Sequence, residues 1–324
     1  MQIINSLDGL RISEKTSVAL GNFDGIHLGH QDIMQSAAGA AKEKGLSSLC
    51  FTFSNHPFNY ILGRDASDPA AVKLICSEAE KISLIAGMGF DILVNVPFDD
   101  SIMKMRARGF FEDVLIGKLN AGCICAGFNY SYGARAEGTP AMLREECASA
   151  GIDCIIRDAV TLGGRVVSST LIRETIASGD MELVKSYLGR PLSFAGRVEH
   201  GNRIGSANGC PTANIVPEAD RKLPPDGVYF SRTLIGGREY KSVSNLGVKP
   251  TIEADGGQRS IETNIFDFDG DLYGRDIAVS FEHFSRTESR FATKEELFDQ
   301  IRRDCDEARR YDYIQQSEKH ECDM

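Results

Sequence analysis

The sequence predicts an α/β chain of two domains, an open parallel sheet covered by helices followed by a small closed antiparallel β-barrel with a C-terminal helix. Up to about Val160, strand-like and helix-like segments alternate, which is the pattern of a parallel sheet. Beyond about Arg190, strand-like segments follow one another without helices, as in an antiparallel barrel. The length of 324 residues suits two domains, since roughly 150 residues per domain is usual.

Five apolar segments of the N-terminal half have the composition of strands. They are residues 17–20, 46–53, 90–96, 121–126 and 152–156. We expect helices over residues 31–44, from a capping box at Ser77 and Glu80 to about Met88, and over residues 101–118. Right-handed crossovers bring the carboxyl ends of the strands to one edge, where ligands bind in such sheets.

The turn after the first strand reads GNFDGIHLGH over residues 21–30. It leads into a helix, whose unpaired N–H groups and dipole favour phosphate, and its glycines let a ligand approach the backbone. His27 and His30 are three residues apart, so on a helix both imidazoles would face the same phosphate chain. A His-x-x-His pair by itself could equally be a surface pair or half of a metal site.

Three further motifs follow later strands of the N-terminal half. They are TFSNHP at 52–57, GFNYSYG at 127–133 and VSSTLIR at 167–173. In the last motif, hydroxyl groups can cap a helix or bind phosphate oxygens, and Arg173 can donate two hydrogen bonds to a phosphate. A short helix over residues 180–188, capped by Asp180, ends at Gly189 and places the domain boundary nearby.

The C-terminal half contains strand-like segments and one helix that begins at Thr293 and runs to about Arg310. The segments are residues 194–198, 228–235, 240–246, 261–268 and 277–281. The motifs GCPTAN at 209–214, NLGVKPT at 245–251 and IETNIFDF at 261–268 occur in this half. Hydroxyl and amide oxygens such as those of Thr212 and Asn214 are suitable ligands for hard cations. Glu262, taken alone, could be an exposed acid on an alternating strand.

Composition excludes several classes of protein. The formal net charge is −10, which argues against non-specific binding to nucleic acid. Apolar runs are too short to span a membrane and a signal-peptide pattern is lacking, so we expect a cytoplasmic protein without membrane contact. The nine cysteines include no Cys-x-x-Cys pair, and we expect Cys50, Cys76, Cys123, Cys125 and Cys154 to pack as small apolar side chains.

Together the motifs resemble the bacterial bifunctional riboflavin kinase/FAD synthetase family, whose N-terminal domain belongs to the nucleotidylyltransferase superfamily. The resemblance runs from about Gly21 to about Asp304. It implies a Rossmann-like FMN adenylyltransferase domain over residues 1–186, a β-barrel riboflavin kinase domain over 187–314 and a polar tail over 315–324. It also implies two ATP-dependent steps with Mg²⁺, from riboflavin to FMN and from FMN to FAD.

The resemblance assigns roles to individual residues. In the first domain, the resemblance makes Gly21, Phe23, Asp24 and Gly25 nucleotide-binding residues of the turn, and makes His27 and His30 catalytic residues that contact the triphosphate of ATP. His56 and Asn129 help to organise the substrates, while Ser168, Ser169, Thr170 and Arg173 hold phosphates. Asp24 is either a water-mediated partner of Mg²⁺ or a residue that stabilises the turn.

In the second domain, the resemblance places Thr212 and Asn214 around Mg²⁺ and the phosphates of ATP, and makes Glu262 the general base. Gly205 belongs to the glycine loop, and Arg286 either closes the site or belongs to an ordinary charged loop. The chain carries Ser206 and Cys210 where the family commonly has Arg and Phe.

These two departures keep alternatives open. One alternative is an FAD synthetase with weakened or lost kinase activity, and another is a non-catalytic flavin-binding regulatory protein. A nucleotidylyltransferase for a different substrate would leave the C-terminal motifs unexplained.

Overall fold

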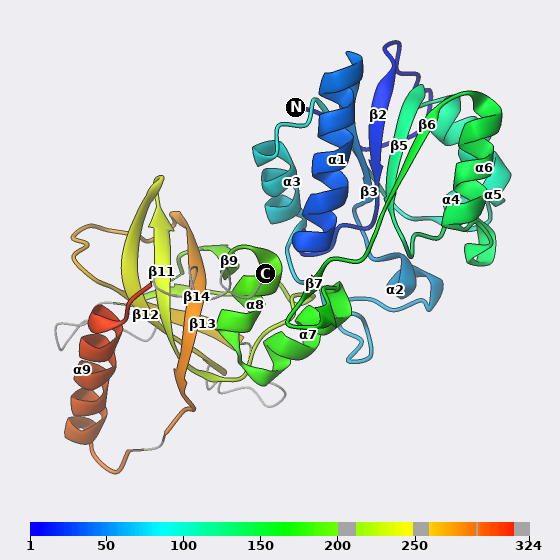
Figure 1. The fold of residues 1–324 in the computed structure, drawn as a ribbon. Coiled ribbons are helices and arrows are strands. Elements are labelled where there is room, and N and C mark those ends of the chain that lie inside the picture. The colour runs from blue at the N-terminus through cyan, green and yellow to red at the C-terminus, as the bar shows by residue number, and fades with distance from the viewer. Residues whose placement is uncertain (200–211, 249–258, 290, 314–324) are drawn as a thin grey trace. The chain divides into compact units, whose positions relative to one another are not determined.

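A computed structural model describes residues 1–199, 212–248, 259–289 and 291–313 of the chain. The chain forms two compact units, Met1–Leu171 and Ile172–Met324 (Figure 1). Each unit has its own sheet, and the two sheets differ in kind as the sequence predicts.

The first unit contains a six-stranded sheet in the order β1-β4-β3-β2-β5-β6, and all its strand pairs are parallel. The strands are β1 (Gln2–Ile4), β2 (Thr16–Leu20), β3 (Ser47–Phe53), β4 (Ile92–Val96), β5 (Ala121–Gly127) and β6 (Asp153–Arg157). Every residue of β2 and β4 is buried, because helices cover both faces of the sheet. The chain runs from β2 outward to β3 and β4, then returns to the other side of β2 with β5. The carboxyl ends of β2 and β5 therefore form the crevice in which such sheets bind ligands.

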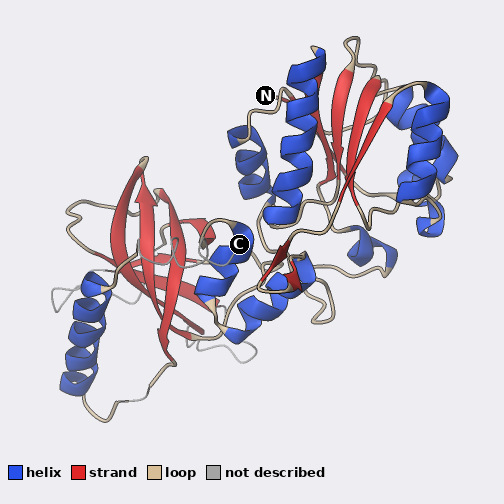
Figure 2. Ribbon diagram, in the orientation of Figure 1, coloured by secondary structure: helices blue, strands red, loops and turns tan. Residues whose placement is uncertain are grey.

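Helices cover both faces of this sheet (Figure 2). The helix α1 (Leu28–Lys44) and α3 (Glu78–Gly87) contribute to one apolar cluster, which also holds Cys50, Cys123 and Cys125. The π-helix η1 (Phe110–Ile116) and α6 (Pro140–Ala150) contribute to the cluster on the opposite face. The predicted packing role of these three cysteines is confirmed, since all are fully buried.

Shorter elements complete the first unit. They are α2 (Pro57–Ile61), α4 (Asp100–Met103), α5 (Ala107–Gly109), the 3-10 helix η2 (Ala134–Ala136), and the hairpin of β7 (Thr161–Leu162) and β8 (Arg165–Val166). The helix α7 (Ser169–Ser178) begins at the end of this unit and continues into the second.

The single helix predicted over residues 101–118 is wrong. The backbone of Arg106 is extended, with φ −65° and ψ 153°, and separates α4 from α5 and η1. The carboxylate of Glu137 accepts hydrogen bonds from Arg106 Nε at 2.6 Å and from the backbone N–H of Ala107 at 2.8 Å. This contact from a residue some 30 positions away satisfies the new helix start, and it left no signal in the local sequence.

The second unit contains a six-stranded antiparallel sheet in the order β10-β13-β12-β11-β14-β9. Its strands are β9 (Leu192–Arg197), β10 (Thr212–Ile215), β11 (Gly227–Ile235), β12 (Arg238–Val248), β13 (Arg259–Ile265) and β14 (Asp276–Arg286). The backbone N–H of Glu199 donates to the carbonyl oxygen of Asn214 at 2.9 Å. This bridge joins the two edges of the sheet and gives the predicted barrel.

Two helices pack on this barrel. The helix α8 (Met181–Leu188) contacts β14 and β9, and its predicted cap is confirmed because Asp180 accepts from the backbone N–H of Leu183. The helix α9 (Lys294–Arg310) contacts the outer faces of β11 and β12. Thr293 caps α9 by accepting from the backbone N–H of Glu296. Successive side chains of a strand point to opposite faces. One set of side chains on β11 and β12 therefore fills the interior of the barrel, and the other set faces α9.

Candidate active sites

The turn between β2 and α1 has a left-handed backbone at three positions. Phe23, Gly25 and Ile26 have φ values of 49°, 83° and 40°. A Cβ atom on Gly25 would lie 2.9 Å from Cγ2 of Ile75, so both the backbone and the available space require glycine there. The sharp turn leaves the backbone of residues 21–27 at the carboxyl edge of the sheet, directly before the start of α1.

The two histidines of the turn lie together, although not as two residues of one helix. His27 is the N-cap of α1, and its Nδ1 accepts a hydrogen bond from the backbone N–H of His30 at 3.3 Å. The rings stack with centroids 3.6 Å apart and planes at 19°. Because Nδ1 is the acceptor, a neutral His27 carries its proton on Nε2. The expected shared helix face is therefore corrected to a cap that stacks on the first turn.

Asp24 fixes the turn to the loop that precedes α3. Its Oδ1 accepts from the backbone N–H of Ile75 at 2.9 Å, and the N–H of Gly25 donates to Sγ of Cys76 at 3.2 Å. The hydroxyl of Ser169 donates to the carbonyl oxygen of Asp24 at 3.0 Å. Of the two interpretations of Asp24, these contacts favour stabilisation of the turn.

A cavity of about 510 Å³ opens beside this turn. Five of the predicted site residues line it: Gly21, Phe23, His30, His56 and Asn129. They follow β2, β3 and β5, so the predicted convergence of these motifs at one edge is found. Much of the remaining wall is aromatic and aliphatic, from Phe58, Ile61, Phe98, Phe110 and Tyr130. The size and the mixture of apolar wall and few polar groups suit a small-molecule ligand.

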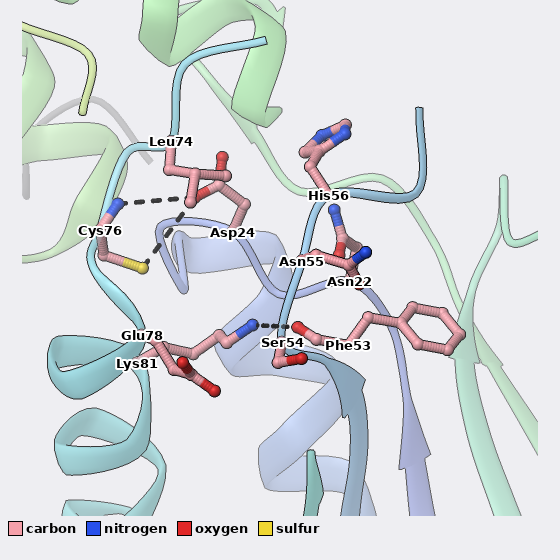
Figure 3. Close-up of a pocket in the computed structure, with 10 residues that line it drawn as sticks. All are labelled: Asn22, Asp24, Phe53, Ser54, Asn55, His56, Leu74, Cys76, Glu78 and Lys81. Atoms are coloured by element: carbon pink, nitrogen blue, oxygen red, sulfur yellow. Dashed lines mark hydrogen bonds between the residues drawn. The ribbon is translucent and has the colours of Figure 1, made fainter. Parts of the chain in front are cut away.

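A second, much smaller cavity of about 20 Å³ adjoins the first (Figure 3). Asn22, Phe53 and His56 line both cavities, and Asp24 lines the smaller one. On the side of α3 its wall includes Glu78 and Lys81.

The predicted phosphate-binding motif at 167–173 surrounds the start of α7. Ser168 accepts from the backbone N–H of Leu171 at 3.2 Å, so its hydroxyl caps the helix. Ser169 donates to the carbonyl oxygen of Asp24 in the turn at residues 21–30, and Thr170 is exposed. Arg173 is half-buried on the part of α7 that belongs to the second unit.

In the second unit, one row of residues crosses the outer face of the barrel. Glu262 on β13 pairs with Asn214 on β10 and with Asn245 on β12. The same row continues through Val228 on β11 to Arg286 on β14. Residues that pair directly share a face of the sheet, so the catalytic base predicted from sequence lies between two amide side chains.

A cavity of about 520 Å³ is lined by every residue of this row except Asn214. Its polar wall includes Thr212, Asn245, Glu262, Asn264 and Arg286. Its apolar wall comes from Val228 and Val243 on the barrel, and from Phe291, Leu297, Phe298 and Ile301 in and before α9. The cavity therefore presents polar groups on one side and apolar side chains on the other.

Arg286 is held by a carboxylate of α9. Its Nη2 and Nε lie 2.6 and 3.0 Å from the two carboxylate oxygens of Asp304, which is 4% exposed. This hydrogen bond raises the pKa of Arg286, and the guanidinium stays charged. The bidentate ion pair links the end of β14 to α9, and a role of Arg286 in closing the site stays a prediction.

The buried amide oxygen of Asn214 is a candidate ligand for a cation. Asn214 is 3% exposed, and its Oδ1 has no hydrogen-bond partner among the described residues. Thr212 lies two residues earlier on the same strand, so its hydroxyl shares that face. A hydroxyl and an amide oxygen fit Mg²⁺ completed by phosphate and water oxygens. The described residues hold no cluster of three or more His, Cys, Asp or Glu suited to a metal.

Some predicted residues lie outside the described ranges. These are Gly205, Ser206, Cys210, the end of the motif at 245–251 and the polar tail at 315–324. The sequence did not single out Asn264, Asp304 or Lys81 as site residues. Asn264 belongs to the motif at 261–268 and lies two residues after Glu262 on the same strand. Residues at this spacing share a face of the sheet, and this spacing is the sequence signal that could have identified Asn264.

Comparison with known proteins matches the two halves of the chain to two different families. The FAD synthetase family model matches residues 10–171, and the riboflavin kinase family model matches residues 188–312. A protein of Bacillus subtilis named bifunctional riboflavin kinase/FMN adenylyltransferase is 37% identical over 92% of this chain and 92% of its own. One of the same name from Escherichia coli K12 is 32% identical over 94% of this chain and 96% of its own.

A solved structure also covers nearly the whole chain. It is described as a macrolide-efflux protein from Streptococcus pneumoniae, and it aligns with a TM-score of 0.84 and 30% identity over 96% of this chain and 99% of that one. Among the described residues here, no helix is both long and apolar enough to cross a membrane. Both family models and the curated relatives agree on flavin chemistry. The chain therefore belongs to the bifunctional riboflavin kinase/FMN adenylyltransferase family and is a transferase of FMN and FAD biosynthesis with both activities.

Proposed function

We propose that each activity has its own site, with FMN adenylylation in the cavity beside the turn at residues 21–30 and riboflavin phosphorylation in the cavity under α9. The observation that carries this proposal is that each cavity gathers the motif residues of one activity only: His30, His56 and Asn129 in the first, Thr212 and Glu262 in the second. We assign the first activity to residues 1–186 and the second to residues 187–314.

In adenylyl transfer, a phosphate oxygen of FMN attacks the α-phosphate of ATP and pyrophosphate leaves. The chain needs no covalent intermediate for this step, so it acts by positioning and by stabilising charge. The N–H groups at the start of α1 and the imidazoles of His27 and His30 face the triphosphate. Ser168, Ser169, Thr170 and Arg173 hold phosphate oxygens, and the aromatic wall of the cavity accommodates the flavin ring.

In the kinase step, Glu262 takes the proton from the 5′-hydroxyl of the ribityl chain as that oxygen attacks the γ-phosphate of ATP, and ADP leaves. Thr212 and Asn214 hold Mg²⁺, which when bound neutralises charge on the phosphates. Gly205 contributes to the loop around ATP, and Arg286 keeps α9 in place over the flavin. The use of ATP in both steps favours a cytoplasmic location.

The proposal is tested by incubating the purified protein with riboflavin, ATP and Mg²⁺ and separating the flavins by chromatography. FMN is expected first and FAD after it. Conversion of added FMN to FAD with riboflavin untouched would support the alternative of an FAD synthetase without kinase activity. The absence of both products from folded protein would contradict the proposal.

A further inference from the structure

Lys81 is a buried cation in the interior of the first unit. It lies on α3, its residue is 7% exposed, and its Nζ donates to the carbonyl oxygen of Phe53 at 2.5 Å (Figure 3). Among the described residues, no carboxylate oxygen makes an ion pair with Nζ. Removing an ammonium group from water is costly unless the charge is well compensated. A single carbonyl oxygen compensates this cost only weakly, so the buried charge lowers the stability of the folded protein.

The surroundings of Lys81 belong to the adenylylation site. It lines the cavity of about 20 Å³ together with Asp24, Asn22 and His56, and that volume suits about one water molecule. Asn22 and His56 also line the larger cavity assigned to adenylyl transfer. Lys81 therefore lies between the turn that carries His27 and the strand end that precedes His56.

The carbonyl oxygen of Phe53, which accepts from Lys81, lies close in the chain to His56. Phe53 is the last residue of β3, and His56 follows it three residues later as the N-cap of α2. Only Ser54 and Asn55 separate this strand end from His56, so a shift of the strand end would also shift the imidazole. A hydrogen bond to the carbonyl of Phe53 fixes that end.

The charge of Lys81 also has a counterpart in the turn. Burial lowers the pKa of the Lys81 ammonium, while electrostatic interactions oppose that shift, the one with Cys76 first, followed by those with Asp24, Cys50 and Glu78. Glu78 accepts from Nδ2 of Asn95 at 2.6 Å, and Asp24 accepts from the backbone of Ile75. Of these two acids, Glu78 is exposed and Asp24 is buried in the turn at residues 21–30.

We propose that Lys81 is a positioning residue for adenylyl transfer, which holds the carboxyl end of β3 through Phe53 and balances the charge of Asp24 in the turn. It acts through these two residues and not on the substrate. This inference rests on the proposed location of the adenylylation site. Proteins retain charged residues that lower stability mainly where the function requires them. Lys81, which adjoins the proposed reaction site, has this character.

The test compares Lys81→Met, which fills the space without charge or donor, with Lys81→Gln, which keeps an N–H donor for Phe53. Both are made in the full chain, and the exposed Lys42→Met on α1 is the control. The wild-type protein must first convert FMN to FAD; if it does not, the proposed site itself fails. Three quantities are measured: kcat and KM for FMN adenylylation, the rate of riboflavin phosphorylation in the same preparation, and the melting temperature.

In Lys81→Met we expect kcat for adenylylation to fall roughly tenfold to hundredfold, because misplacement of about 1 Å has effects of that size. The KM for FMN should stay within about twofold, because the lost interactions act on the transition state. Phosphorylation of riboflavin should match Lys42→Met, the melting temperature of Lys81→Met should equal or exceed that of Lys42→Met because a buried charge is removed, and the adenylylation rate of Lys81→Gln should be intermediate. Full adenylylation activity in Lys81→Met would overturn the proposal. So would a parallel loss of both activities with a lowered melting temperature in both variants, since that would be a structural role alone.

Discussion

The hydroxyl of Ser169 donates a hydrogen bond of 3.0 Å to the carbonyl oxygen of Asp24, a residue 145 positions earlier in the chain. This contact joins the motif at the start of α7 to the nucleotide turn. Asp24 in turn accepts from the backbone of Ile75. The turn is therefore held from two sides, and its geometry should control adenylylation.

Substitution of Gly25 tests the geometry of the turn. Gly25→Ala places a Cβ in a left-handed backbone 2.9 Å from Ile75, so we expect a loss of about 1–3 kcal/mol in stability and of most adenylylation activity. Gly39→Ala, within α1 and with no atom within 4 Å of its added Cβ, is the control and should gain about 0.5–1 kcal/mol. Melting curves and FAD formation measure both effects. Equal behaviour of the two variants would contradict this account of the turn.

Removal of the amide of Asn214 tests the proposed magnesium site. In Asn214→Ala, the Mg²⁺ concentration that gives half-maximal kinase activity should rise roughly tenfold or more, as for the loss of a metal-site contact. Asn214→Asp keeps an oxygen ligand and should need less Mg²⁺ than Asn214→Ala. Titration of kinase activity with Mg²⁺ gives the values. An unchanged Mg²⁺ requirement in Asn214→Ala would remove this residue from the site.

The ion pair between Arg286 and Asp304 should stabilise α9. Asp304→Asn leaves the Arg286 charge without its carboxylate, and we expect a loss of about 1–3 kcal/mol in barrel stability together with a higher KM for riboflavin. Asp299→Asn on the same helix breaks an exposed pair with Arg302 and should cost less than about 1 kcal/mol. Calorimetric melting and kinase assays provide the comparison. Equal losses in both variants would show that burial of the pair has no effect.

Asp91 gives a pH dependence that is independent of both sites. The backbone N–H and the hydroxyl of Ser48 both donate to its carboxylate and hold the pKa of Asp91 below its usual range. An acid with a lowered pKa contributes stability above its unfolded pKa, near 3.8, and loses it as the pH falls through the lower folded value. Asp91→Asn should therefore lower the melting temperature at pH 7 more than at pH 3. A difference that grows on acidification would have the wrong sign.

Sequence reasoning predicted what depends on local pattern. The strand-to-helix turn with His27 and His30, the cap of α8 by Asp180 and the strand that carries Glu262 are all encoded within a few residues. The contacts of Glu137 with Ala107 and of Asp304 with Arg286 join residues distant in the chain, and they had no local signature. The short strands β1 and β10 also escaped prediction, because three or four residues are too few to display a period.

Lys81 shows a signal that could have been used. It is a lysine within the apolar-periodic segment between Ser77 and Met88. The pattern alone could therefore have raised the possibility that this lysine lies on the buried side of the helix. Its partner Phe53 and its nearness to Asp24 needed the tertiary structure.

The central claim is that two independent sites divide the two activities. The most direct measurement compares Glu262→Gln with His30→Ala in assays of riboflavin phosphorylation and FMN adenylylation. Glu262→Gln should lower phosphorylation by about 10²–10⁴-fold, the usual contribution of a general base, and leave adenylylation unchanged. His30→Ala should lower adenylylation by about 10²-fold, as for a lost group that stabilises transition-state charge, and leave phosphorylation unchanged. Loss of both activities from either single substitution in folded protein would contradict the account.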